Sequence, residues 1–355
     1  MIELALAFTD KDGSYSEHAA AALASVFRNT SSELQVHILH DESLLEENKI
    51  KLAQLAADFK HPIHFYPVAL PAEMMDVLSG TGSIDRWTWG SLYRLLLPAV
   101  VPAERVIYLD CDVMVNMDIT ELWEINLNGG YLGAIHDQGI HGIAEIVAVQ
   151  GLNPETYFNS GVILFDLNAI RQHVTWFEEM LNFFRAFPGT SMPDQDCLNH
   201  VFGGNCLLLD QRFNWFYAPG AEVDFQQKIV HFAGDMKCWD PLSPGYTLYQ
   251  ENLRLTPWSK EPILPAPIRR STDRKARHLL MKRKTRKHSS RKPSSRHRSE
   301  RVVMRKRRKA TRHSRYSRHK SATGSGSKSR ILTMRRSSRR KHAMYIQGFS
   351  SGIYL

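Results

Sequence analysis

An abrupt change in charge near residue 265 limits which part of this chain can fold. Residues 265–355 contain 31 Lys and Arg but only two acids, a net charge of +29, whereas residues 1–264 hold 15 basic and 34 acidic residues, a net charge of −19. A segment so basic and so poor in apolar side chains does not bury enough surface to fold alone. We therefore expect a folded domain over 1–264 and a polybasic, low-complexity, disordered tail over 265–355.

Short apolar runs alternate with helical patterns along the expected domain. Strands that alternate with helices are typical of βαβ units, which predicts an α/β fold with a mostly parallel sheet flanked by helices. A helix is expected to begin at Ser14, because Ser14 and Glu17 have the spacing of a capping box. The expected strands are 2–8, 34–40, 63–68, 104–110, 157–167 and a short one in 228–239, and the further expected helices are 43–59, 90–97, 169–186 and 192–202. The expected apolar face of helix 169–186 consists of Ile170, Val174, Phe177, Met180, Leu181 and Phe184.

Two aspartates one residue apart follow one of these strands. In "ERVIYLDCDVMV", Asp110 and Asp112 lie where a buried strand is expected to end, and burying two carboxylates without partners would cost several kcal/mol. Ligands of mostly parallel sheets bind beyond the carboxyl ends of the strands. Asp10 follows the strand 2–8 in the same way, so we expect the two loops to share one site.

The Asp-x-Asp pair has three interpretations. Carboxylate oxygens suit a hard cation such as Mg²⁺ or Mn²⁺. An apolar strand followed by Asp-x-Asp also begins the phosphotransferases of the haloacid dehalogenase type, but these have Thr or Val two residues after the second Asp, where this chain has Met114. A Mg²⁺-dependent, phosphatase-like hydrolase is therefore a second hypothesis. The third interpretation is a pair of solvated loop acids.

Several motifs, taken in order, resemble those of family 8 glycosyltransferases. These are retaining enzymes of the GT-A fold and include bacterial lipopolysaccharide galactosyl- and glucosyltransferases and glycogenins. "LAFTDKDGSY" resembles the family's nucleotide-binding opening, "LYRLLLP" its segment with a donor-contacting basic residue, and "YLDCDVMV" its metal motif. "YFNSGVILFDL" resembles its FN[AS]G strand, "PDQDCLN" its DQD helix and "HFAGDMKCW" its HxxGxxKPW signature, with Cys238 where the family usually has Pro.

The resemblance implies a GT-A catalytic domain that transfers galactose or glucose from a UDP-sugar, with retention, to a glycan or lipid-linked saccharide. It implies that Asp110, Asp112 and His231 bind Mn²⁺ or Mg²⁺. An extra residue in the first loop leaves both Asp10 and Asp12 as candidates for the nucleotide contact. The donor-binding residues that it implies are Thr9, Asp10, Tyr15, Arg94, Asp110, Cys111, Asp112, Asn159, Ser160, Asp194, Gln195, His231, Gly234 and Lys237.

The chemistry of these residue types agrees with the resemblance. Two carboxylates and an imidazole form a mixed oxygen and nitrogen site of the kind that Mn²⁺ accepts. A departing diphosphate needs cations around it, and Lys237 adds one while Gly234 lets the backbone approach the phosphates. Each residue also has a plain structural interpretation: His231 as a core histidine, Lys237 as a solvated turn residue and Arg94 as a snorkelling side chain.

Gln195 and Asp194 are the catalytic candidates. Retention by double displacement needs a carboxylate on the ring face opposite to the leaving group, and the family has an amide there, which Gln195 matches. Because glutamine is a poor nucleophile, we expect same-face substitution in which the departing phosphate oxygen takes the acceptor's proton. Asn159, Asp194 and Gln195 offer hydrogen bonds to the sugar, although Asn159 also suits a turn and Asp194 the start of a helix.

The basic tail predicts contact with a polyanion. It would bind anionic lipid with about 1 kcal/mol per Lys or Arg near the surface, bind nucleic acid through phosphates, or remain a solvated appendage. We place an anionic membrane surface before nucleic acid, since related bacterial enzymes act on lipid-linked acceptors at the inner membrane face. A non-catalytic protein that binds nucleic acid or membranes through this tail is the third hypothesis for the whole chain.

The beginning of the chain and its cysteines predict the compartment. "MIELALAFTD" lacks the basic region of a secretory signal, and the sequence holds no apolar run of the length that spans a bilayer. Four cysteines without CxxC pairs suit a reducing environment. We therefore expect a cytoplasmic protein, peripheral on the inner face of the membrane.

Overall fold

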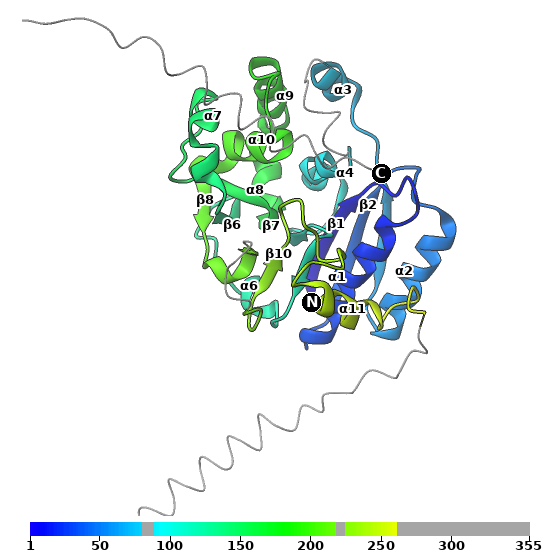
Figure 1. Cartoon of the computed structure of the whole chain (residues 1–355). Coiled ribbons are helices and arrows are strands. Elements are labelled where there is room, and N and C mark those ends of the chain that lie inside the picture. Colours follow the sequence, from blue (N-terminus) through cyan, green and yellow to red (C-terminus); the bar gives the residue numbers. More distant parts are fainter. Residues whose placement is uncertain (80–88, 218–223, 261–355) are drawn as a thin grey trace, which may run out of the picture. The chain divides into compact units, whose positions relative to one another are not determined.

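A seven-stranded β-sheet forms the middle of the part of the chain that the computed structural model describes, residues 1–79, 89–217 and 224–260 (Figure 1). The predicted tail over 265–355 lies outside these described residues. Along the sheet the strand order is β3-β2-β1-β4-β7-β6-β8. The strands are β1 (Ile2–Phe8), β2 (Leu34–His40), β3 (Ile63–Pro67), β4 (Arg105–Leu109), β6 (Leu132–His136), β7 (Phe158–Asp166) and β8 (Cys206–Leu208).

The sheet is mostly parallel, as predicted. β1 pairs in parallel with β2 on one side and with β4 on the other, and Leu4 of β1 lies opposite Ile107 of β4. β7 runs antiparallel to both β4 and β6, and β8 pairs in parallel with β6. Because β1 and β4 are parallel neighbours, the loops that follow Phe8 and Leu109 leave the same edge of the sheet.

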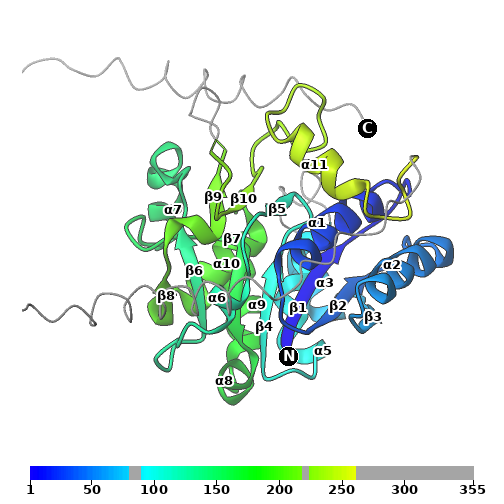
Figure 2. The same cartoon turned by 90° about the horizontal axis from the view of Figure 1, so that it is seen from below.

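Helices cover both faces of this sheet. They are α1 (Tyr15–Asn29), α2 (Glu46–Asp58), α3 (Ala72–Ser79), α4 (Trp89–Leu92), α5 (Leu97–Val100), α6 (Thr120–Trp123), α7 (Ala144–Val149), α8 (Leu167–Gln172), α9 (Trp176–Ala186), α10 (Pro193–Phe202) and α11 (Tyr246–Leu253). α1 and α11 lie side by side (Figure 2). Within the described ranges, no helix is both long and apolar enough to cross a membrane.

Alternation of side chains along the strands supplies one core for each face. Leu4 and Leu6 of β1 belong to the core that includes side chains of α1, α2 and α11. Ala5 and Ala7, which point the other way, belong to the core that includes side chains of α3, α8, α9 and α10. The near-continuous apolar sequence of β1 thus reflects burial on both faces, which is typical of a parallel strand.

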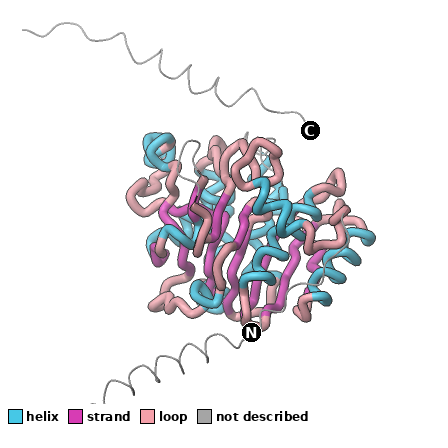
Figure 3. The backbone as a smooth tube through the Cα atoms, turned by 60° about the horizontal axis from the view of Figure 1, so that its bottom comes forward, coloured by secondary structure: helices cyan, strands magenta, loops and turns pink. Residues whose placement is uncertain are grey.

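A second, three-stranded sheet brings distant segments to the edge of the first. It consists of β5 (Val113–Val115), β10 (Ile229–His231) and β9 (Trp215–Phe216), with β10 in the middle. Figure 3 shows the strands of the domain with helices and loops around them. Since β5 follows β4 after a turn of three residues, this pairing carries the end of β10 close to the Asp-x-Asp turn.

Two helix predictions are wrong in their extent. The segment predicted as one helix over 169–186 forms α8 and α9, and Val174, expected on the apolar face, lies in the break with 89% of its surface exposed. The break falls where Thr175 takes the N-cap position of α9. The segment predicted as a helix over 90–97 is divided among α4, the 3₁₀ helix η1 (Tyr93–Leu96) and α5.

The predicted capping box at the start of α1 is also wrong. The Ser14 hydroxyl donates to Asp12 Oδ1 (2.7 Å) and makes no capping bond. Instead, the buried Asp10 carboxylate accepts from the backbone N–H of Ser16 (3.1 Å). Asp10 therefore satisfies a free N–H in the first turn of α1, where a negative charge also suits the helix dipole.

Candidate functional site

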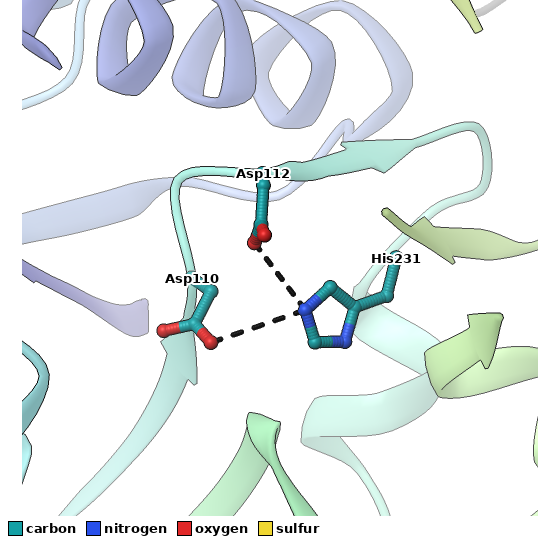
Figure 4. Close-up of side chains that lie close together, drawn as sticks. All are labelled: Asp110, Asp112 and His231. Atoms are coloured by element: carbon teal, nitrogen blue, oxygen red, sulfur yellow. Dashed lines mark ion pairs between the residues drawn. The ribbon is translucent and has the colours of Figure 1, made fainter. Parts of the chain in front are cut away.

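Three potential metal ligands meet beyond the carboxyl end of β4. Asp110 follows β4, Asp112 precedes β5 and His231 ends β10. Figure 4 shows the imidazole directed at both carboxylates. His231 Nε2 lies 3.3 Å from Asp112 Oδ1 and 4.0 Å from Asp110 Oδ2, and one ligand atom from each residue lies within 4.8 Å of the others. The fold thus brings together the three residues predicted as metal ligands.

Backbone pairing holds these residues in place. Because β10 runs antiparallel to β5, His231 lies opposite the residue that follows Asp112, and the next residue, Phe232, donates its N–H to Asp112 O (3.1 Å). On the other side, the N–H of Asp110 donates to the carbonyl of Gly161 in β7 (2.8 Å). The positions of the ligands therefore depend on strand register.

The imidazole of His231 occupies the space above Gly161. A Cβ at position 161 would lie 2.2 Å from Cε1 of the ring, far closer than real Cβ contacts. On its other side the ring meets Phe216 edge to face, with centroids 5.3 Å apart. The absence of a side chain at Gly161 is what lets the imidazole reach the carboxylates.

The arrangement of donors and acceptors suits a cation between these groups. His231 Nδ1 lies 2.9 Å from Asn214 Oδ1, an acceptor, so Nδ1 donates to it, and in the neutral imidazole Nε2 presents its lone pair. Nε2 then faces both carboxylates, so that one nitrogen and two oxygen atoms converge on the same point. The residues present therefore fit a divalent ion such as Mn²⁺ or Mg²⁺.

Lys237 balances the charge of the Asp112 carboxylate. Lys237 Nζ lies 2.8 Å from Asp112 Oδ2. Burial disfavours the charged form of each group, but their attraction outweighs it, so the pKa of Asp112 lies below its ordinary value and the pKa of Lys237 lies above. Lys237 is thus a cation beside the candidate metal site and not a solvated turn residue.

Arg94 is buried and links two acidic residues of the site. Its Nη2 lies 2.8 Å from Asp110 Oδ1, and its Nε lies 3.2 Å from Asp194 Oδ2. It also donates to the carbonyl of Ser160 (2.7 Å), and its guanidinium lies over the ring of Tyr108. Burial opposes its charge, yet the two carboxylates keep the pKa of Arg94 above its ordinary value. Only 5% of Arg94 is exposed, so the snorkelling interpretation is wrong.

The predicted catalytic residues lie at the start of α10, next to β7. Gln195 Oε1 accepts from Asn159 Nδ2 (2.9 Å) and from the N–H of Ser160 (3.0 Å). Its Nε2 donates to Asp137 Oδ2 (3.0 Å) and to the hydroxyl of Tyr157 (3.1 Å). These contacts fix the orientation of the Gln195 amide, because a carboxylate can only accept a hydrogen bond and a backbone N–H can only donate one.

The remaining predicted residues lie around these two groups. Thr9 and Cys111 are buried, and burial raises the pKa of the Cys111 thiol. Both oxygens of the Asp10 carboxylate are engaged, with Ser16 and with Asn48 Nδ2 (2.9 Å from Oδ2). Asp12 is exposed. Of the two candidates for the nucleotide contact, Asp12 is thus the more accessible.

The loop after β10 is open at one end and anchored at the other. Gly234 is exposed, and a Cβ there would meet nothing within 4 Å. At the other end of the loop, the ring of Trp239 stacks on His18 of α1, with centroids 3.7 Å apart, and lies edge-on to Tyr15. His18 Nδ1 in turn lies 2.8 Å from the Tyr249 hydroxyl of α11.

Acidification is expected to weaken this anchor. Burial lowers the pKa of His18 to about 4, whereas an unfolded chain has a histidine pKa of about 6.5. The unfolded state therefore binds more protons between these values, and the free energy of unfolding should fall as the pH drops from about 6.5 to 4, by up to about 3 kcal/mol. Urea unfolding at the two ends of this pH range measures the change in the free energy of unfolding. His18→Phe keeps a flat ring against Trp239 but does not titrate, so it should lose less stability; an equal loss in both proteins would contradict the prediction.

Comparison with known proteins identifies the family. The model of glycosyl transferase family 8 matches residues 6–242. The chain belongs to this family. It is 27% identical to general stress protein A of Bacillus subtilis, over 64% of this chain and 85% of the relative, and 24% identical to lipopolysaccharide 1,2-glucosyltransferase of Escherichia coli, over 76% and 83%. The crystal structure of galactosyltransferase LgtC with donor and acceptor sugar analogues is 22% identical and matches the fold with a TM-score of 0.62, over 73% of this chain and 98% of that one.

This family 8 chain is therefore a glycosyltransferase with the GT-A fold, as its motifs predicted. Such enzymes use a nucleotide-sugar donor and a saccharide acceptor and generally need a divalent metal. The Asp110, Asp112 and His231 cluster is its candidate metal site.

Sequence reasoning missed three residues of the candidate site of this family 8 enzyme. Asp137 and Tyr157 hold the Gln195 amide, and Asn214 holds His231. Asp137 directly follows β6, so the signal that revealed Asp110, an acid at the carboxyl end of a strand, would have revealed it too. Asn214 has no such signal, because its partner lies on a strand that only the tertiary fold brings close.

Proposed function

We propose that this enzyme is a metal-dependent, retaining hexosyltransferase that moves galactose or glucose from a UDP-sugar to a glycan or lipid-linked saccharide. The observation that carries the proposal is the cluster of Asp110, Asp112 and His231 beside the Arg94–Asp194 pair, in a family 8 fold. The names of the relatives, which include lipopolysaccharide glucosyl- and galactosyltransferases, support the classes of sugar and acceptor.

The site would bind the donor through its diphosphate. Asp110, Asp112 and His231 would hold Mn²⁺ or Mg²⁺, which when bound would neutralise the diphosphate as it departs. Lys237 lies beside Asp112 with its charge retained, and the exposed backbone at Gly234 is open to phosphate oxygens. Thr9, Tyr15 and Cys111 would complete the nucleotide site, with Asp10 shaping the loop and Asp12 accessible to the nucleoside.

The contacts around Gln195 favour substitution on one face of the sugar. The nearby carboxylates are poor nucleophiles, because Asp194 pairs with Arg94 and accepts from the Ser160 hydroxyl (3.0 Å), and Asp137 accepts from Gln195. In the proposed reaction the acceptor oxygen bonds to the anomeric carbon while the bond from that carbon to the phosphate oxygen breaks. The acceptor's proton passes to the phosphate oxygen of the departing UDP. Asn159, Ser160, Asp194 and Gln195 would position the sugar by hydrogen bonds.

A panel of nucleotide sugars tests this function. Purified protein is incubated with UDP-galactose, UDP-glucose and other UDP-sugars in Mn²⁺, and slow release of UDP to water is measured without an acceptor. One or two UDP-hexoses are expected to react and to raise the melting temperature, since a ligand of the folded state stabilises it. Release of phosphate from a phosphate monoester without release of UDP would favour the phosphatase-like hypothesis. If neither UDP nor phosphate is released, the hypothesis of a non-catalytic binding protein is the one that remains.

Removal of the Gln195 side chain is expected to slow transfer without stopping it. Gln195→Ala takes away the amide that would contact the sugar but no metal ligand and no nucleophile, so a loss of about 10- to 100-fold is expected. UDP release and transfer to an acceptor measure it. A covalent glycosyl adduct on Gln195 or Asp194, detected by mass spectrometry, would contradict same-face substitution and restore double displacement.

We propose that the enzyme works in the cytoplasm, at the inner face of the membrane, and that the basic tail supplies the membrane contact. The charge of +29 over 265–355 supports this, and so do the free cysteines of the described residues, Cys111, Cys197, Cys206 and Cys238. Anionic head groups attract such a segment, and salt screens the attraction.

Truncation after residue 265 is expected to separate binding from catalysis. UDP release should stay nearly unchanged, because every proposed site residue precedes Trp239. Sedimentation with phosphatidylglycerol vesicles should fall, and that of the full chain should fade as salt rises, whereas phosphatidylcholine vesicles bind neither protein. An inactive truncation, or vesicle binding that ignores both salt and the tail, would contradict the prediction. If the full chain prefers nucleic acid to anionic vesicles at physiological salt, the membrane role of the tail is wrong and the tail binds nucleic acid instead.

A further inference from the structure

We propose that Asn214 is a positioning residue that fixes which nitrogen of His231 carries the proton, so that Nε2 is free to bind the metal. This inference rests on the metal dependence of the proposed function and adds a residue to it. Asn214 is fully buried, and its Oδ1 lies 2.9 Å from His231 Nδ1. It ends the 3₁₀ helix η4 (Gln211–Asn214) and contacts the imidazole at Nδ1, whereas the ring faces the two carboxylates with Nε2.

The direction of the hydrogen bonds around Asn214 follows from neighbouring groups that can only donate or can only accept a hydrogen bond. The backbone N–H of Gly161 donates to Asn159 Oδ1 (2.9 Å), which makes that atom an acceptor. Asn159 Nδ2 donates to Asp137 Oδ2 (3.1 Å), in agreement with this orientation. Asn214 Nδ2 must then donate to Asn159 Oδ1 (2.8 Å), and Asn214 Oδ1 is left as an acceptor.

The proton of His231 follows from the same chain of bonds. Because Asn214 Oδ1 accepts, His231 Nδ1 must carry a proton, and in the neutral imidazole that binds a metal the lone pair is then on Nε2. Nε2 is the atom that faces Asp110 and Asp112. A backbone N–H at Gly161 thus sets the tautomer of a metal ligand through Asn159 and Asn214.

The backbone keeps Asn214 at this distance. β9 begins directly after it and pairs in parallel with β10, so that Phe216 lies opposite His231. Gln138 braces the same turn: its Nε2 donates to the carbonyl of Asn214 (2.8 Å), and its Oε1 accepts from the N–H of Phe216 (3.2 Å). Strand pairing and Gln138 therefore fix the backbone of Asn214 relative to that of His231.

The same amides connect the metal ligands to the catalytic candidate. Asn159 Nδ2 also donates to Gln195 Oε1 (2.9 Å). Loss of Asn214 should therefore act first on the metal, through His231, and only indirectly on the sugar site. Residues that orient a metal-bound histidine typically contribute 10- to 100-fold to metal affinity, and we expect an effect of about this size here.

Two substitutions of Asn214 separate orientation from packing. Asn214→Leu keeps the shape of the side chain but removes the acceptor, and Asn214→Asp keeps an acceptor for Nδ1 but loses the donation to Asn159. The control, Asn252→Leu, removes a buried asparagine of α11 that lies outside the proposed site. Mn²⁺ affinity of the full-length proteins is measured by the electron paramagnetic resonance of free Mn²⁺, and melting curves report folding.

We expect Asn214→Leu to bind Mn²⁺ about 10- to 100-fold more weakly, and Asn214→Asp and Asn252→Leu to bind it almost as the natural chain does. Saturating Mn²⁺ should restore most of the UDP release of Asn214→Leu. A folded Asn214→Leu with unchanged Mn²⁺ affinity would overturn the inference, and so would an Asn214→Asp that is as weak as Asn214→Leu.

The natural chain supplies a test that does not depend on the folding of a variant. Nitrogen-15 spectra of histidine-labelled protein in Mg²⁺, with His231 assigned by substitution, report which ring nitrogen is protonated. The inference requires a protonated Nδ1, and a protonated Nε2 would overturn it. If the natural chain binds no divalent ion and releases no UDP, the metal dependence has failed; if it does both while Asn214→Leu behaves normally, only the role of Asn214 has failed.

Discussion

Asp112→Asn is expected to lower UDP-hexose turnover by about 10³-fold or more while the chain remains folded. Asparagine has almost the same size as aspartate, so packing should survive. The substitution removes a negative charge that lies 2.8 Å from Lys237 and 3.3 Å from His231 Nε2. The cluster then holds one carboxylate in place of two, and an unpaired Lys237 repels a divalent ion. Asp110→Asn should cause a comparable loss, with some added instability because Arg94 loses a partner.

Asp58→Asn is the matched control for these substitutions. Asp58 is exposed at the end of α2, so the change removes one acid of the same type away from the proposed site. UDP release and Mn²⁺ affinity are measured for all three variants, together with melting temperatures. Full activity in either Asp110→Asn or Asp112→Asn would remove the metal site from our account.

Gly161→Ala is expected to have the second largest effect, although it adds only a methyl group. The added Cβ would lie 2.2 Å from Cε1 of His231, so the ring must move by an ångström or more. Displacement of a catalytic group by about 1 Å costs on the order of 100-fold in rate. Since the imidazole is also held by Asn214 and meets Phe216, it has little room to adjust without leaving the carboxylates. Both Mn²⁺ affinity and UDP release should fall.

Gly204→Ala provides the comparison for Gly161→Ala. A Cβ at Gly204 would meet nothing within 4 Å, so the same chemical change should have little effect there. The His231 ring can be observed directly in the Gly161→Ala variant by the nuclear magnetic resonance shifts of its carbon-bound protons. Unchanged shifts and unchanged Mn²⁺ affinity would show that the ring tolerates the methyl group, and the packing argument would then be wrong.

The strands of the sheet could be predicted because burial on both faces leaves a direct mark on the sequence. The expected strands 2–8 and 34–40 agree with β1 and β2 in every residue. Helix boundaries were harder, because apolar periodicity alone does not record where a helix breaks. Over 169–186 the pattern continues through Val174, yet Thr175 begins a new helix there and leaves Val174 exposed.

The candidate site could be predicted only as far as its residues carry local signals. Asp110 and Asp112 follow a strand, and His231 lies in a family motif, so sequence reasoning grouped them. The spatial relations that orient them, such as Gly161 beneath the ring and Asn214 beside it, depend on strand register in two sheets. Similarly, the cation at Arg94 could be found in its motif, but its bridge between Asp110 and Asp194 follows from the packing of η1 beside β4 and α10.

The dependence of UDP release on Mn²⁺ tests the central claim most directly. The full-length protein is treated with a chelator, dialysed, and assayed with its preferred UDP-hexose as Mn²⁺ is added back. We predict no turnover after chelation and its full return when the Asp110, Asp112 and His231 site is saturated, at a concentration that matches the affinity measured by electron paramagnetic resonance. Full turnover in the presence of excess chelator would contradict our account of this site.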